Sequence, residues 1–505
     1  MNNSNVAQKE FNHVDNDAKR LSRDTLTYGI AVIIPALIGI ISISIYTRIF
    51  SVEAYGEYNQ VFNTTLVITT LFSQWIQQSI QRYRPLYRDK SQLKQFDSNL
   101  MNLLVLMFLI IVGFGLVGGI FKELLGRYES YYWICILLVL TQFTFLVLGA
   151  LLQSDFKGKM YKNYNLLTAI LKFAFGLLLI FYVNRAPVSI VYGLVLGQLI
   201  LLISMFRTTG LSIRLIKISS LGESLTFIKM FMTYGFPMVG WFIGTSILNL
   251  ADRYMLESLG TIKDVGVYSA NYSIVSASLG LLTTPLLTAA HPIIMNKVGK
   301  LPDIEIGKTI TYFTRIYLTI SLPLLAFIAV FHKEITQLFL GESFREGSII
   351  IPILFLGLIF WNVGMYGHKG YEIREKTKVM LSFIVVSALV NIILNLFLIP
   401  SYGYIGAAIA TLISMGIYPL LIKVFSYKYI TWRINLLSIL KVVLTTIITA
   451  LVVGSLKNFL SNYIFFQLVF GGGIGLIIYI SLLFVLKEID YQAIKKKVTA
   501  KFAKR

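Results

Sequence analysis

The sequence predicts an all-α membrane protein that crosses the bilayer many times. Of its 505 residues, 56% are hydrophobic and 14% are charged, and the mean hydropathy is +0.73. Soluble proteins carry about 25% charged residues, so this composition could not cover a water-exposed surface. The apolar residues also fall in blocks of about 20, which is the length of a helix that spans a bilayer.

Fourteen such blocks are predicted along the chain. The first begins near Leu26 and is longer than the apolar region of a cleavable signal peptide, so we expect it to remain as a span. The expected spans are residues 26–49, 59–80, 100–121, 131–153, 164–183, 187–206, 225–248, 266–290, 310–331, 348–367, 379–399, 403–424, 437–457 and 463–486.

The distribution of charge predicts that both termini are cytoplasmic. The chain has 45 Lys and Arg against 24 Asp and Glu, and the basic residues concentrate in the segments that an even number of spans places inside. The net charge of +21 therefore indicates topology in the cytoplasmic membrane, and no nucleic-acid partner is expected. We expect a cytoplasmic N-terminal segment at residues 1–25 and a basic cytoplasmic tail at 487–505, beside anionic membrane lipids.

The short loops argue against a catalytic domain or a bound cofactor. The expected loops are too short for a folded domain, and no GxxxxGK[ST] motif for a nucleotide phosphate occurs. No cluster of His, Cys, Asp and Glu has the spacing of metal ligands. The chain is therefore expected to be a transporter without a cofactor or metal, and not an enzyme.

Two stretches of the chain resemble each other in order. Residues 27–58 begin with TYG and end with AYGEY, while residues 233–268 begin with TYG and end with VGVY. An arginine follows the TYG in each copy, at Arg48 and Arg253. This predicts two pseudo-symmetric six-helix lobes of the same orientation, at residues 26–206 and 225–424, an architecture that recurs in transporters. Two additional helices, 437–486, lie outside the duplication.

These segments are similar to those of a known family. The pattern of six, six and two spans, with TRIFSVEAYGEY, LADRYMLESLG, LFLGESF and NLFLIPSYGYIGAAIATLIS, resembles the polysaccharide-transport branch of the multidrug/oligosaccharidyl-lipid/polysaccharide exporter superfamily. That branch includes the O-antigen (lipopolysaccharide) and capsule-repeat flippases. The resemblance implies a flippase that moves polyprenyl-diphosphate-linked oligosaccharides by alternating access. The protein is expected to act as a monomer and to interact with the polysaccharide polymerase machinery.

Such a substrate requires a polar, basic cavity, because its diphosphate and sugars cannot cross hydrocarbon unpaired. Lys172 is the deepest cation in the expected spans and could contact the diphosphate, or it could extend its ammonium to the membrane surface. A polar row in the second span could bind sugar hydroxyls, or it could join helices by hydrogen bonds. The row is Asn63, Thr70, Gln74, Gln77 and Gln81.

Charged residues at the outer end of the first helix of each repeat form a candidate gate. Arg48 and Arg253 could anchor these helices at the membrane interface. Alternatively, they could line the outer mouth and pair with Asp252 or Glu53 when it closes, which would bias alternating access. Pro35, Pro237 and Pro323 lie within expected spans and are possible hinges, although membrane helices also tolerate proline without such a role.

Other functions remain open at this stage. A multidrug or organic-cation antiporter of the same superfamily would need carboxylates inside the membrane, and no acidic residue lies in the middle of an expected span. A flippase for lipid-linked peptidoglycan precursors fits the same chemistry. A membrane polysaccharide polymerase or a glycosyltransferase would need a catalytic site on a sizeable outer loop, and the outer loops are short.

Overall fold

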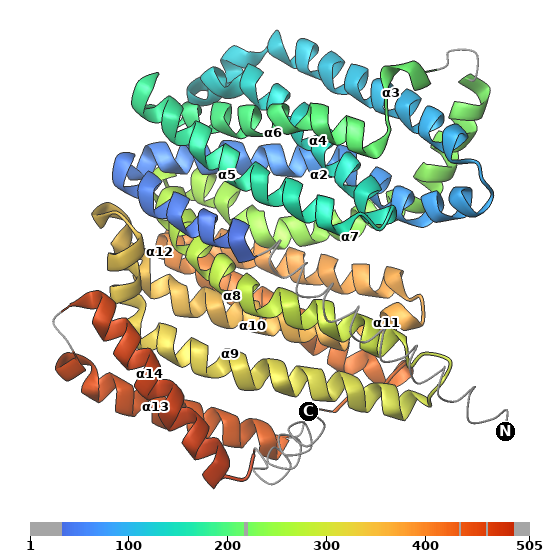
Figure 1. The fold of residues 1–505 in the computed structure, drawn as a ribbon. Helices are drawn as coiled ribbons and strands as arrows, with labels where there is room; N and C mark the ends of the chain where they lie inside the picture. The colour runs from blue at the N-terminus through green and yellow to red at the C-terminus, as the bar shows by residue number, and fades with distance from the viewer. Residues whose placement is uncertain (1–32, 217–220, 434–435, 461–462, 489–505) are drawn as a thin grey trace, which may run out of the picture. The chain divides into compact units, whose positions relative to one another are not determined.

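A computed structural model describes residues 33–216, 221–433, 436–460 and 463–488 (Figure 1). The described residues are almost entirely helical and contain no strand. The expected all-α, multi-span fold class is therefore confirmed. The expected N-terminal segment 1–25 and nearly all of the tail 487–505 lie outside the described residues.

The helices pack into two compact units, Met1–Gly266 and Val267–Arg505. The boundary falls inside α8 (Ile262–Met295), so α7 (Leu221–Leu259) packs within the first unit. This division by packing differs from the lobes expected from the repeat, 26–206 and 225–424, but it does not test the duplication, which stays a prediction.

The first unit is built around one polar helix. Its elements, in order, are the helix Ile33–Ile49, α2 (Val52–Asp89), α3 (Leu93–Gly119), η1 (Lys122–Tyr131), α4 (Tyr132–Ser154), α5 (Gly158–Tyr182), α6 (Val188–Thr209) and α7. The central helix, α2, packs against α3, α4, α6 and α7. Ser51 caps its N-terminus, with the side chain accepting a hydrogen bond from the amide of Ala54.

Helices α5 and α6 pack closely because glycines at their contact leave no side chain between the two backbones. A Cβ atom on Gly197 of α6 would lie 2.5 Å from the backbone nitrogen of Lys172 on α5. A Cβ atom on Gly193 would overlap the backbone of Gly176 in the same way. The GLVLG sequence at 193–197 is therefore a small-xxx-small packing motif of the kind that lets membrane helices approach closely.

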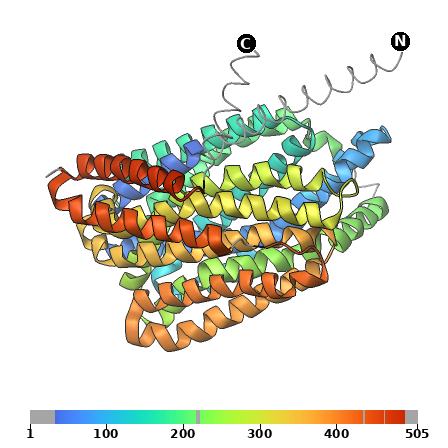
Figure 2. The same ribbon diagram turned by 90° about the horizontal axis from the view of Figure 1, so that it is seen from below.

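The second unit contains the remaining helices. They are most of α8, then α9 (Asp303–Phe339), η4 (Glu342–Ile349), α10 (Ile350–Gly367), α11 (Lys369–Ile373), α12 (Thr377–Phe425), α13 (Leu436–Leu460) and α14 (Ile464–Val485). The last two helices, α13 and α14, lie side by side and both pack against α9 (Figures 1 and 2).

Ten described helices are long and apolar enough to cross a membrane, or eleven if the bent α7 counts as one span. The expected number of fourteen is therefore not confirmed. Four expected spans account for the difference from eleven, two of them because they merge into one helix. The described part of the first, Ile33–Ile49, is short, the second lies in the polar helix α2, and 379–399 and 403–424 fall together in α12, which breaks at Gly403.

Candidate functional site

The polar row expected in the second span lies on α2. Asn63 is 6% exposed, and its side-chain nitrogen has no hydrogen-bond partner. Gln77 donates to Ser73 Oγ at 3.0 Å and to Gln74 Oε1 at 3.4 Å, so these bonds run along the helix. Most of the amide donors of this row therefore form no hydrogen bond between helices.

Gln81 is the member of the row that reaches a neighbouring helix. Its side-chain nitrogen donates to Gln153 Oε1 of α4 at 3.3 Å, and the residue is exposed. This bond matches the interhelical interpretation of the row, whereas the environments of Asn63, Gln74 and Gln77 do not. The binding of sugar hydroxyls by the other members of the row stays a prediction.

Lys172 lies within a polar cluster inside the first unit. Its ammonium donates to Gln142 Oε1 of α4 at 3.2 Å. Gln142 Oε1 also accepts from Gln198 of α6, and Gln198 Oε1 accepts from Thr141 at 3.0 Å. Among the described residues, no carboxylate lies within ion-pair distance of Lys172.

This cluster contains residues that the sequence analysis missed. Gln142 lies in the expected fourth span, and Gln198 lies in the sixth and is completely buried. The signal was present, because a glutamine in the middle of an apolar block is costly unless it has a polar partner. The sequence does not reveal that Gln142 bonds to both Lys172 and Gln198. No hydrogen bond joins Lys172 to the α2 row among the described residues.

The two repeat-related arginines have different environments. Arg48 is exposed and donates to the carbonyl of Ser44 at 2.6 Å. Arg253 is 4% exposed and donates to the carbonyl of Asn249 at 2.5 Å. Each guanidinium therefore bonds to the carbonyl four residues earlier in its own helix, and the choice between an anchoring role and a gating role stays open.

The two candidate acidic partners also differ. Asp252 is completely buried, whereas Glu53 is exposed in the first turn of α2. The pairing of either carboxylate with Arg48 or Arg253 during transport stays a prediction, because the structure holds one conformation.

The three candidate hinges differ in what surrounds them. Pro35 lies near the start of the helix Ile33–Ile49, which continues through it. Helix α7 bends by 46° between its parts Gly222–Phe236 and Val239–Leu259, and Pro237 falls at this break but lies outside the residues whose side chains are described. In α9, the backbone departs from helical angles at Phe331 and not at Pro323. A hinge role for all three stays a prediction.

A second cluster that the sequence analysis missed joins the ends of α2, α3 and α4. Arg84, which is 3% exposed, bonds to Asp155 at 2.7 Å and also to Asp97. Arg88 bonds to Asp155 as well. Burial alone would raise the pKa of the Asp155 carboxyl, but the hydrogen bonds and positive charges of Arg84 and Arg88 outweigh burial and hold that pKa below its usual value.

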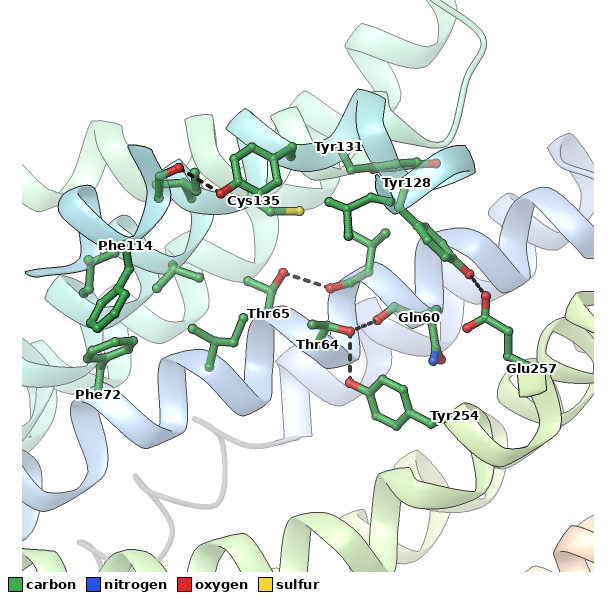
Figure 3. A pocket seen from close by; sticks show the side chains of 18 residues that line it. Gln60, Thr64, Thr65, Phe72, Phe114, Tyr128, Tyr131, Cys135, Tyr254 and Glu257 are labelled. Carbon is green, nitrogen blue, oxygen red and sulfur yellow. Dashed lines mark hydrogen bonds between the residues drawn. The ribbon is translucent and has the colours of Figure 1, made fainter. Parts of the chain in front are cut away.

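The first unit also contains a cavity of about 470 Å³ between α2, α3, α4 and α7 (Figure 3). None of the described residues that line it is a lysine, arginine or histidine, and Lys172 is not among them. It is therefore a different site from the basic one expected for the substrate. The described residues also contain no group of three or more His, Cys, Asp and Glu that could hold a metal ion.

Comparison with known proteins identifies the family. The profile of the family described as Polysaccharide biosynthesis protein matches residues 21–297, and the MatE profile matches residues 237–397. The chain belongs to the polysaccharide biosynthesis protein family, within the exporter superfamily that the sequence motifs resemble.

Individual relatives are distant. The chain is 22% identical to the probable low-salt glycan biosynthesis flippase Agl15 of Haloferax volcanii over 256 residues, which are 51% of this chain and 54% of that protein. The match thus spans about half the length of that relative. An uncharacterized membrane protein of Methanocaldococcus jannaschii, MJ1068, is 22% identical over 88% of this chain and 90% of its own.

Two solved structures have the same fold. The lipid II flippase MurJ, in an inward closed conformation, aligns with a TM-score of 0.74 at 18% identity, over 90% of this chain and 98% of its own. An inward-facing multidrug resistance MATE family transporter aligns with a TM-score of 0.59 at 15% identity, over 80% and 94%. At these identities the likeness establishes the fold.

Proposed function

We propose that the protein is a flippase that moves polyprenyl-diphosphate-linked oligosaccharide repeats across the cytoplasmic membrane by alternating access, for cell-surface polysaccharide synthesis. Membership of the polysaccharide biosynthesis family supports this proposal. So does the name of the archaeal relative, a probable glycan biosynthesis flippase. In this proposal both termini are cytoplasmic, and the protein acts without a cofactor.

The observation that carries the proposal is the environment of Lys172. Its ammonium meets the neutral amide of Gln142 at 3.2 Å, and no described carboxylate neutralises it. Lys172 is half-buried. A cation within an apolar helix without a counter-ion is costly, and intramembrane charges of this kind are typical of substrate pathways. A diphosphate would supply the missing negative charge, whereas an organic cation would be repelled.

The polar row of α2 supplies hydrogen bonds in this proposal. Gln74, Gln77, Gln81 and Asn63 offer amide donors and acceptors, which suit the many hydroxyls of an oligosaccharide. The unpartnered nitrogen of the buried Asn63 supports this assignment, because a buried donor without a partner is destabilising unless a ligand or water satisfies it.

The outer gate is proposed to use the charges at the ends of the repeat-related helices. Arg48 and Arg253 would pair with Glu53 or Asp252 in the closed state. Ion pairs present in one state alone shift the balance between states. Bending at Pro35, Pro237 and Pro323 would allow the lobes to change conformation.

Deletion of the gene in its own host tests the substrate class. The proposal predicts that lipid-linked repeats accumulate in the inner leaflet, that surface polysaccharide is lost, and that the gene restores both. A flippase for lipid-linked peptidoglycan precursors would instead accumulate those precursors and stop growth. A drug antiporter would change susceptibility to organic cations and leave both lipid pools unchanged, which would contradict the proposal.

A further inference from the structure

The cavity in the first unit has two chemically different ends (Figure 3). One end, at Phe72 and Phe114, is apolar, and Figure 3 shows the two rings facing each other there. The other end holds Gln60, Tyr128 and Glu257, which lie on the opposite side of the same view. Its volume, about 470 Å³, is within the range of small-molecule sites in proteins.

The sequence of α2 produces this gradient. Gln60, Thr64, Ile68 and Phe72 follow one another at four-residue spacing, so they occupy one face of the helix. Along this face the side chains change from amide to hydroxyl to aliphatic to aromatic. The cavity therefore offers polar groups at one end and hydrocarbon at the other, which matches a molecule that is itself amphipathic.

The polar end presents hydrogen-bond acceptors. The hydroxyl of Tyr128 donates to Oε1 of Glu257, and the hydroxyls of Thr64 and Tyr254 lie 2.9 Å apart. Gln60 is 4% exposed and lines the cavity, yet its Oε1 has no hydrogen-bond partner. That oxygen is itself covered by protein, so the acceptors available at this end of the cavity are the hydroxyls of Thr64 and Tyr254 and the carboxylate of Glu257.

A carboxylate lines this end of the cavity, and the nearby Arg127 lies 3.9 Å from a different carboxylate, that of Glu57. Glu257 is the one ionisable carboxylate among the described lining residues, and no described lysine, arginine or histidine lies within ion-pair distance of it. A diphosphate head group would be repelled by this carboxylate, whereas an ammonium group would be attracted. The cavity therefore does not suit the lipid-linked oligosaccharide proposed as the substrate.

The apolar end is accessible from outside the unit. Phe114 is 70% exposed and Ile68 is 37% exposed, and both line the cavity. Phe114 belongs to α3, which is long and apolar enough to span a membrane, so its exposed ring suits contact with acyl chains. A hydrocarbon tail can therefore enter this end from the bilayer.

We propose that this cavity binds a bilayer lipid whose head group carries a primary ammonium, with the ammonium at Glu257 and an acyl chain between Phe72 and Phe114. The occupant is a resident lipid, and the site is separate from Lys172 and the α2 amide row. The proposal rests on the cavity alone, so it stands or falls independently of the proposed transport function.

The single cysteine of the chain provides a direct readout, because Cys135 lines the cavity. The full-length protein would be placed in nanodiscs of phosphatidylethanolamine with phosphatidylglycerol, or of phosphatidylglycerol alone, and the rate of Cys135 alkylation by N-ethylmaleimide measured. The ethanolamine lipid should slow alkylation about tenfold, the affinity difference typical of one charge-assisted hydrogen bond. Equal alkylation rates of the wild-type protein in the two lipid compositions would overturn the proposal.

Two matched variants test the role of the carboxylate. Glu257→Gln keeps the size of the side chain and its ability to accept from Tyr128 but removes the charge, so it should abolish the difference between the two lipids. Glu123→Gln removes an exposed carboxylate of η1 that does not line the cavity, and it should keep the difference. If both variants lose the difference in alkylation rate between the two lipids, or if both keep it, the assignment to Glu257 is contradicted.

A soluble amphiphile separates a lipid from a free organic cation. In phosphatidylglycerol nanodiscs, added dodecylammonium should slow alkylation of Cys135, and added dodecanoate should not, because the head groups differ in charge while the tails match. Protection by dodecylammonium without protection by phosphatidylethanolamine would mean that the site takes free cations and would overturn the lipid assignment. Equal protection by both amphiphiles would mean that the cavity selects for tails alone, which also overturns it.

Discussion

The Nε atom of Arg84 lies 2.7 Å from Oδ1 of Asp155, so a nearly buried guanidinium on α2 is bonded to the residue that ends α4. The same guanidinium also bonds Asp97 of α3, and Arg88 adds a second cation to Asp155. Two cations and two carboxylates thus balance one another at the junction of three helices. The central polar helix is held in place at this end by charge as well as by apolar packing, because Tyr87 contacts the rings of Phe96 and Phe227.

Replacing Arg84 should destabilise the first unit strongly. Arg84→Met leaves Asp97 without a cation, and removing one partner of a buried ion pair costs about 3–5 kcal/mol. The free energy of unfolding would be measured by titration with a denaturing detergent. Arg207→Met, at the exposed end of α6, serves as the control and should change it by less than about 0.5 kcal/mol.

A second substitution identifies the cause. Adding Asp97→Asn to Arg84→Met removes a carboxylate that has lost its cation, so the double variant should be more stable than Arg84→Met alone. If Arg84→Met costs no more than Arg207→Met, the cluster does not hold the three helices together.

The stabilisation from Asp155 should depend on pH. Because the pKa of its carboxyl is held below its usual value, the ionised form is favoured by folding. This contribution is complete above the unfolded value of about 3.9 and is lost as the pH falls through the lower folded value. The difference in thermal midpoint between wild type and Asp155→Asn should therefore be constant near neutral pH and shrink below about pH 4. A difference that instead grew on acidification would contradict the sign.

Close packing of α5 on α6 should be sensitive to a single methyl group. A Cβ atom on Gly197 would lie 2.5 Å from the backbone nitrogen of Lys172 and 2.8 Å from its Cα. Gly197→Ala must therefore push the helices apart, at a cost of about 1–3 kcal/mol. Gly113→Ala in α3, where nothing lies within 4 Å of the added Cβ, should be neutral or stabilise the helix by up to about 1 kcal/mol.

A counter-ion beside Lys172 should block transport of an anionic head group. Gln142→Glu places a carboxylate near the ammonium, which now meets the amide oxygen at 3.2 Å. The new ion pair would neutralise the charge that the substrate is proposed to use, so lipid-linked repeats should accumulate in the inner leaflet while the protein remains abundant in the membrane. The measurement is the inner-leaflet pool in cells that carry the variant.

The matched control adds the same charge elsewhere. Gln92→Glu lies at the exposed start of α3 and should leave transport unchanged. If Gln142→Glu also transports normally, the charge of Lys172 is not used by the substrate.

The sequence alone predicts the fold class, but it does not predict the side-chain contacts between helices. Blocks of apolar residues predict helices from Leu93–Gly119 to Ile464–Val485, because periodicity and length are local properties. The pairing of Gln142 with Lys172 joins residues 30 positions apart, and that of Arg84 with Asp155 joins residues 71 apart. Such pairs depend on which helices become neighbours, which one sequence does not contain.

Polarity was also a misleading guide to the spans. Helix α2 is 38 residues long and is rich in amide, hydroxyl and charged side chains, yet it is the helix around which the first unit packs. It packs against the apolar helices α3, α4 and α7 while Gln74 and Gln77 are half-buried and Gln81 is exposed. The sequence analysis nevertheless expected a span at 59–80 within α2, and the regular spacing of the amides identified the face that carries most of the candidate substrate contacts.

The most direct measurement of the central proposal is flipping of a polyprenyl-diphosphate-linked oligosaccharide by purified protein in proteoliposomes. Wild type should move the lipid between leaflets, Lys172→Ala should not, and Lys172→Arg should retain part of the rate because it preserves the positive charge. Equal amounts of folded protein must be reconstituted in each case. A normal flipping rate for Lys172→Ala would contradict the proposal that this ammonium receives the diphosphate.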